Sequence, residues 1–125
     1  MGYDYSNGSD LYTSYNHSWA FYAYLDEDKG IRWIYGKKGK DVIERLETML
    51  EALEKLIEPD TISYTQFGSY TDIDELGKSY NGLGYFGKDG WDVSDPHVMI
   101  KNAHANVQRI LKYSRNHPLE TWNGD

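Results

Sequence analysis

The sequence predicts an α+β fold in which a small antiparallel sheet of three to five strands packs against two amphipathic helices. Two observations lead to this fold class. Short alternating apolar segments fill the chain before residue 36, and apolar residues recur at helical spacing in two segments after residue 40. A length of 125 residues suits one domain with a buried core. We therefore expect a single α+β domain over residues 1–125.

The segment before residue 36 is expected to form the sheet. Residues 1–9 are polar and are predicted to be a loose or edge segment, and residues 11–15 are predicted as a strand. Residues 18–25 alternate Trp, Phe, Ala and Leu with Ala and Tyr, which is the two-residue period of a strand. Residues 26–30 are expected to turn, and residues 31–35 to return as the next strand of a hairpin.

Two helices are predicted from apolar stripes. The first stripe recurs at three- and four-residue spacing through Val42, Ile43, Leu46, Met49, Leu50, Leu53, Leu56 and Ile57. Asp41 with Glu44 is expected to cap this helix, and Pro59 to end it. A second helix is predicted to start at Ser94-Asp95-Pro96 and to end before Pro118.

The segment between these helices, residues 60–95, contains six glycines. Residues 61–67 form a plausible strand there, and the remainder is predicted as loop. A loop of this length is unusual in a compact domain and indicates either a functional segment or a missed strand.

Composition and charge exclude several function classes. The formal net charge of −7 argues against general nucleic-acid binding, which requires positive potential. The absence of cysteine excludes disulfides, thiolate metal sites and cysteine nucleophiles. No apolar run approaches eighteen residues and nothing resembles a signal peptide, so we expect no membrane association and a cytoplasmic location.

The stretch from Gly30 to Asp41 gathers positive charge. Three of the thirteen basic residues lie within four positions, just before the first predicted helix, where an anion is favoured. The stretch does not match the phosphate loop of nucleotide hydrolases. Gly30 and Gly36 are separated by five residues instead of four, and Lys38 stands where a magnesium-binding hydroxyl is needed. Two interpretations remain, a structural turn and an anion-binding contact.

No catalytic residue, metal ligand or cofactor is predicted. His97 and His104 are seven residues apart, too far along a helix to chelate one ion as a pair. Asp72, Asp74 and Glu75 offer a carboxylate pair for acid–base chemistry, but clustered acids beside glycines are typical of a solvated turn.

Aromatic residues are abundant, at 15% of the chain with twelve Tyr and three Phe. The predicted strands carry them on both faces, so one face is expected to expose rings beside Arg32. Such a surface can stack a nucleotide ring and bind phosphate oxygens. It can equally form an oligomer interface, and small folds with thin cores often oligomerise, so we expect a homo-oligomer.

Patches of sequence resemble a family of small, functionally unassigned phage and prophage proteins. The patches span roughly residues 11–125 and comprise Tyr15-Asn16, Lys29–Arg32, Ile34–Gly36, Gly39, Asn102-Ala103, Pro118, Trp122, Gly124 and Asp125. The chain departs from the family pattern in its Gly-rich middle and in Lys37-Lys38. The resemblance implies a phage accessory protein and carries over no catalytic residue.

The leading hypothesis is a non-enzymatic phage accessory protein that counters host defence by binding a host protein or by sequestering a nucleotide-type signalling molecule. The predicted ligand-binding residues are Arg32, Tyr35, Lys37, Lys38, Tyr15, Asn16, Asn102 and Arg109. Two alternatives remain open. One is a small hydrolase acting on an anionic substrate through Asp72, Asp74 or His104, and the other is an oligomeric structural or assembly protein.

Overall fold

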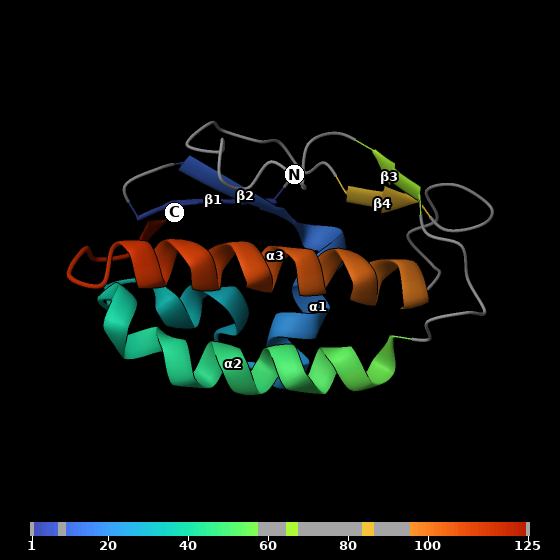
Figure 1. Cartoon of the computed structure of the whole chain (residues 1–125), viewed down its shortest axis with the longest axis horizontal. Coiled ribbons are helices and arrows are strands. Elements are labelled where there is room, and N and C mark those ends of the chain that lie inside the picture. The colour runs from blue at the N-terminus through green and yellow to red at the C-terminus, as the bar shows by residue number, and fades with distance from the viewer. Residues whose placement is uncertain (1, 8–9, 58–64, 68–83, 87–95, 125) are drawn as a thin grey trace.

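The computed structural model describes residues 2–7, 10–57, 65–67, 84–86 and 96–124. Figure 1 shows its elements, which in chain order are β1 (Gly2–Ser6), β2 (Asp10–Ser14), α1 (Tyr15–Tyr24), the 3-10 helix η1 (Gly30–Ile34), α2 (Gly39–Leu56), β3 (Thr65–Phe67), β4 (Gly84–Phe86), α3 (Pro96–Asn116) and β5 (Asn123–Gly124).

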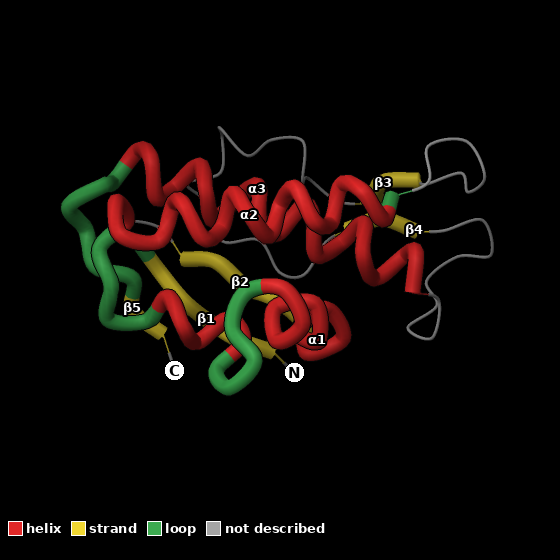
Figure 2. The backbone as a smooth tube through the Cα atoms, turned by 90° about the horizontal axis from the view of Figure 1, so that it is seen from below, coloured by secondary structure: helices red, strands yellow, loops and turns green. Residues whose placement is uncertain are grey.

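Helices α2 and α3 run antiparallel side by side and make the most extensive contact between any two elements (Figure 1). The predicted stripe of α2 is buried at four positions with helical spacing: Val42, Leu46, Met49 and Leu53. In α3 the buried apolar residues include Ala103, Val107, Ile110 and Leu111. Both predicted helices are therefore confirmed. Figure 2 shows α2 and α3 as one layer. Helix α1 and the β1–β2 hairpin lie together on one side of this layer.

The predicted α+β fold class is wrong, because the segments expected to supply most of the sheet are helical. Residues 18–25 lie largely in α1, and residues 31–35 lie largely in η1. Nearly every residue from 18 to 25 is apolar or aromatic, so a two-residue period and a helical period fit equally well. Burial distinguishes them, since the adjacent Ala20 and Phe21 are both buried and Leu25 follows one turn later.

Strands form only a minor part of the described chain. β1 pairs with β2 as an antiparallel hairpin, with Tyr3 opposite Thr13, and the two-residue β5 pairs with the other side of β1. The prediction that residues 1–9 are a loose or edge segment is thus wrong for β1. The short β3 and β4 pair separately, so Gly84–Phe86 is a strand and not the predicted loop.

The C-terminal residues run back along the turn before α2 and hold it in place. Backbone hydrogen bonds link Gly36 N–H to the Trp122 carbonyl and Trp122 N–H to the Lys37 carbonyl, both at 2.8 Å. Lys38 and Thr121 form an antiparallel bridge beside them. Gly36 adopts φ +82°, which glycine tolerates best. The turn therefore owes its shape to residues some eighty positions later in the chain.

Candidate anion-binding site around Trp33

Trp33, on the 3-10 helix η1, carries two cationic side chains against its indole ring. Lys37 Nζ lies 4.4 Å from the ring centroid and also donates a hydrogen bond to the Trp33 carbonyl at 2.6 Å. The guanidinium carbon of Arg45, on α2, lies 4.6 Å from the same centroid. Each distance is within the range of a cation–π interaction. The indole thus brings together two positive charges from different elements.

The carboxylate of Asp26 lies beside these cations. Its Oδ1 lies 3.6 Å from an Arg45 nitrogen, and its Oδ2 accepts backbone N–H bonds from Asp28 at 3.2 Å and Lys29 at 2.7 Å. These backbone bonds fix the turn between α1 and η1. We call Lys29, Lys37 and Arg45 the Trp33 cation cluster.

The pKa of Lys37 reports the electrostatics of this cluster. Burial lowers the pKa of Lys37 most, repulsion from Lys29 and from Arg45 lowers it further, and Asp26 offsets part of the effect. Repulsion from the neighbouring cations therefore acts on Lys37 in addition to its burial. A bound anion would relieve this repulsion.

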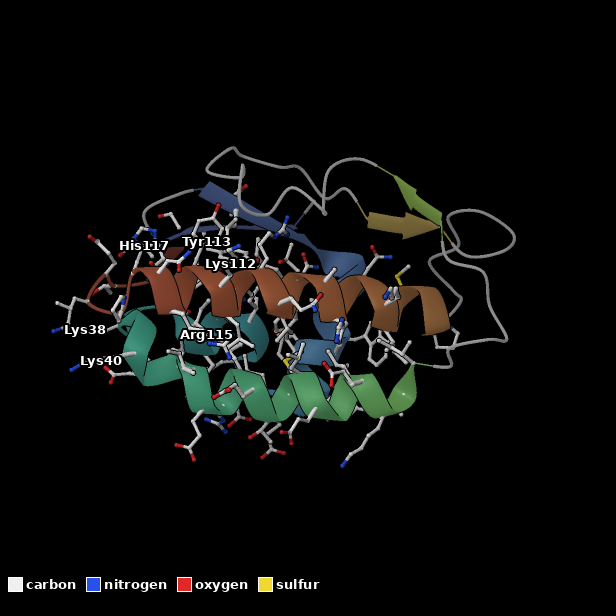
Figure 3. All side chains as sticks on the ribbon, in the orientation of Figure 1. Lys38, Lys40, Lys112, Tyr113, Arg115 and His117 are labelled. Atoms are coloured by element: carbon white, nitrogen blue, oxygen red, sulfur yellow. The ribbon has the colours of Figure 1, made fainter. Side chains whose placement is uncertain are left out.

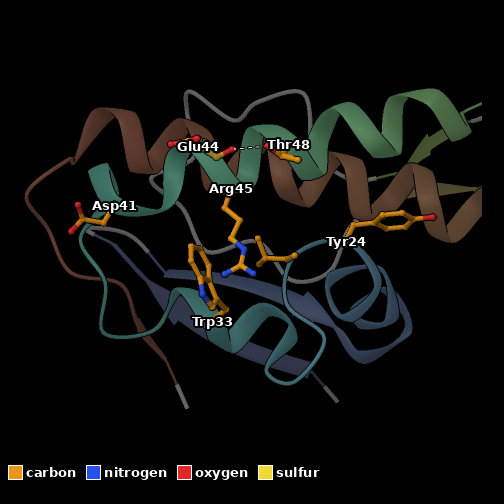
Figure 4. A pocket seen from close by; sticks show the side chains of 7 residues that line it. Tyr24, Trp33, Asp41, Glu44, Arg45 and Thr48 are labelled. Carbon is orange, nitrogen blue, oxygen red and sulfur yellow. Dashed lines mark hydrogen bonds between the residues drawn. The ribbon is translucent and has the colours of Figure 1, made fainter.

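An open groove of about 550 Å³ adjoins Trp33, between the end of α1, η1 and the first half of α2. Its lining residues are Tyr24, Leu25, Trp33, Asp41, Glu44, Arg45 and Thr48. Figure 4 shows Arg45 reaching from α2 toward Trp33, with Tyr24 and Asp41 at opposite ends. The volume falls in the range of small-molecule sites. The groove combines two aromatic walls, one guanidinium and two carboxylates.

Arg32 and Tyr35 lie away from this groove. The Arg32 guanidinium stacks 4.9 Å from the ring centroid of Tyr3, on β1. Burial raises the pKa of Tyr3, as does its hydrogen bond with Tyr22, while Arg32 lowers it. The Tyr35 ring instead packs directly against Gly124 in β5. Arg32 and Tyr35 were both predicted to contact the ligand, and neither lines the groove.

Lys38 lies at the end of the molecule where α2 starts and α3 ends. Figure 3 shows it there with Lys40, Lys112, Arg115 and His117. The expected Asp41 cap is wrong, because α2 begins at Gly39 and Lys38, three residues before Asp41, holds the N-cap position. The amides of Gly39 and Lys40 donate to the carbonyls of Glu120 and Pro118 at 2.9 and 3.0 Å. These protein contacts occupy the amides that an anion at this helix start would need.

Asn102 and Arg109 are fully buried on α3. Arg109 Nη2 donates a hydrogen bond to Asn106 Oδ1 at 2.6 Å. Full burial of both side chains indicates a structural role inside the fold, and the structure does not bring them to the Trp33 groove.

The remaining candidate residues are only partly described. The predicted strand over residues 11–15 is confirmed as β2 except at its last residue, because Tyr15 and Asn16 begin α1. Asp72 and Asp74 lie outside the described residues. His104 is buried and its Nε2 lies 3.2 Å from Glu54 Oε1 on α2.

Sequence reasoning missed Arg45 and Trp33 as a pair. The sequence predicts no site role for Arg45, and it places Trp33 in the strand expected over residues 31–35. Lys37 lies beyond the end of η1, in the turn after Gly36, so no helical spacing in the sequence indicates its contact with Trp33.

Within the described residues, no three His, Asp or Glu side chains gather in a way that could hold a metal ion. Of the helices in that part of the chain, none is both long and apolar enough to cross a membrane.

Comparison with protein-family models, with curated proteins and with solved structures gives no significant match. The resemblance to phage and prophage proteins therefore stays a prediction from the sequence.

Proposed function

We propose that the protein is a non-enzymatic binding protein that sequesters a nucleotide-type anion in the groove beside Trp33. The observation that supports this proposal is the pair of cations, Lys37 and Arg45, held on one indole at the edge of an open groove.

The mixed lining of the groove favours a nucleotide over a simple inorganic anion. A phosphate group would pair with Arg45, and the neighbouring charges of Lys37 and Lys29 would add positive potential. A planar base can stack on Tyr24, since the indole of Trp33 already carries Lys37 and Arg45. The carboxylates of Asp41 and Glu44 can accept hydrogen bonds from hydroxyl or amino groups, which inorganic phosphate at neutral pH offers poorly.

The biological setting in this proposal comes from the sequence resemblance. A phage accessory protein of this kind would act in the host cytoplasm and counter host defence by withdrawing a signalling nucleotide. Binding of a host protein is the other form of the same hypothesis.

A thermal-shift titration tests the proposal, with nucleoside monophosphates, cyclic nucleotides and inorganic phosphate as the probes. A ligand that binds only the folded state raises the free energy of unfolding. The increase should be about 2.7 kcal/mol at a ligand concentration one hundred times Kd. Arg45→Met should weaken nucleotide binding by roughly tenfold or more, since a charge-assisted hydrogen bond is lost. Lys37→Met should have a smaller effect, because Lys37 does not line the groove.

Lys40→Met is the matched control, as it removes one exposed cation from the first turn of the same helix, away from the groove lining. It should leave binding unchanged. An absence of any shift at millimolar nucleotide, or an equal loss in Arg45→Met and Lys40→Met, would contradict the proposal. Recovery of intact nucleotide after denaturation separates sequestration from the hydrolase alternative.

A further inference from the structure

The residues along the Trp33 groove follow a fixed order of chemistry. On α2 the groove-lining residues Asp41, Arg45 and Thr48 stand at positions i, i+4 and i+7, so they share one face of the helix. Figure 4 shows Arg45 between Tyr24 at one end of the groove and Asp41 at the other. The order from end to end is therefore an aromatic ring, a guanidinium and a carboxylate. A ligand that stacks on the ring and pairs with the guanidinium meets the carboxylate next.

Three carboxylates lie close to Arg45, either in the fold or along its helix. Asp26 Oδ1 lies 3.6 Å from an Arg45 nitrogen, and two backbone N–H groups hold its other oxygen in place. Asp41 is one helical turn before Arg45, and Glu44 is the preceding residue; both line the groove. Like charges repel, so the attraction of the Trp33 cation cluster for an anion is confined to the neighbourhood of Arg45.

We propose that the groove selects nucleotides that carry a single phosphate group and rejects nucleoside diphosphates and triphosphates. This inference rests on the proposed function, because it places a base on Tyr24 and a phosphate on Arg45. A second or third phosphate extends away from the base, toward the Asp41 end of the groove, where the carboxylate repels it. A hydroxyl or amino group at that end instead donates a hydrogen bond to the carboxylate.

This selectivity is the opposite of what the cations alone would give. An isolated group of cations binds a triphosphate more tightly than a monophosphate, because additional negative charge gains additional Coulomb energy. The chain as a whole offers no further attraction, since its formal net charge is −7. A preference for the less charged nucleotide therefore reports the carboxylates of the groove.

Isothermal titration calorimetry measures this preference, with the monophosphates and triphosphates of adenosine, guanosine, cytidine and uridine as the probes. The buffer contains EDTA and little salt, so that neither a divalent cation nor screening masks the carboxylates. For each base that binds, the monophosphate should bind about three- to tenfold more tightly than the triphosphate, a modest ratio because Asp41 and Glu44 are exposed. Added salt should narrow this ratio.

Asp41→Asn should raise the affinity for the triphosphate more than the affinity for the monophosphate, because it removes the charge and keeps the size of the side chain. The ratio of the two affinities should then approach one. Glu51→Gln is the matched control, since it removes one exposed carboxylate from the same helix, outside the groove lining. It should leave the ratio unchanged.

A triphosphate that binds as tightly as its monophosphate, or more tightly, overturns this inference and leaves the proposed function standing. An unchanged ratio in Asp41→Asn, or an equal change in Glu51→Gln, overturns it in the same way. If neither form of any nucleoside binds, the inference is also overturned, and the cyclic nucleotides of the thermal-shift titration then test the proposed function alone.

Discussion

The indole N–H of Trp122 donates a hydrogen bond to the Ser114 hydroxyl over 2.9 Å, and both side chains are fully buried. The Trp122 ring also lies 5.7 Å from the ring of Tyr5. Trp122 therefore ties the C-terminal residues to α3 and to the β1–β2 hairpin at one point.

Trp122→Ala should lower the free energy of unfolding by about 3 to 5 kcal/mol, because it removes a large buried side chain and leaves a cavity. Trp122→Phe should cost less, since most of the apolar contact remains and the main loss is the bond to Ser114. Urea denaturation of both variants measures this order. A larger loss in Trp122→Phe than in Trp122→Ala would contradict it.

Gly39→Ala should destabilise the protein although alanine is the better helix former. A Cβ at Gly39 would lie 2.6 Å from the carbonyl oxygens of both Ser114 and His117. We expect a loss of about 2 to 3 kcal/mol from this overpacking. At Gly36 a Cβ meets no atom within 4 Å, so Gly36→Ala should cost only the backbone strain of φ +82°, about 1 kcal/mol. Thermal denaturation of the two variants measures which one loses more stability. A smaller loss in Gly39→Ala than in Gly36→Ala would contradict the prediction.

Arg109→Met should act on stability and not directly on ligand binding. The fully buried guanidinium donates a hydrogen bond to Asn106, and Arg109→Met removes this bond from the interior. We expect a loss of about 1.5 to 3 kcal/mol, the range for a hydrogen bond to a charged group. Gln108→Ala, at an exposed position on the same helix, should change stability by less than about 0.5 kcal/mol. If Arg109→Met stays stable but loses nucleotide binding, the sequence-based assignment of Arg109 to the ligand is right and the structural role is wrong.

His104 should make the protein less stable in mild acid. Burial lowers the pKa of His104, and the bond to Glu54 offsets only part of this effect. As the pH falls below about 6.5, the unfolded chain takes up a proton at His104 before the folded chain does. The free energy of unfolding therefore falls with pH in this range. His104→Gln should flatten the profile between pH 7.5 and 5, measured by urea denaturation. An unchanged pH dependence in His104→Gln would show that other groups cause the loss.

Helices α2 and α3 were predictable from the sequence because each buries one apolar stripe, and a stripe with a 3.6-residue period fits no strand. The capping of α2 was not predictable in the same way. Asp41 and Glu44 match a capping box, yet carbonyls from Pro118 and Glu120 satisfy the first amides, and these residues are distant in the chain.

The candidate site was likewise predictable from the sequence only in part. Lys37 was identified from local sequence because the basic turn stands out in an acidic chain. Arg45 and Trp33 were not, because they lie on different elements and meet only when α2 packs beside η1. Arg32 stacks on Tyr3 instead, and Lys38 lies at the N-cap of α2, at the end of the molecule where α3 ends.

Composition and periodicity alone established the two amphipathic helices, the exclusion of cysteine chemistry and the concentration of positive charge between residues 37 and 40. These properties are local, so neighbouring residues are enough to specify them. Whether residues 18–25 form helix or strand, and which cations share the indole of Trp33, depended on tertiary packing. Uniformly apolar or aromatic segments carry no period of their own, and only burial against the rest of the fold selects their conformation.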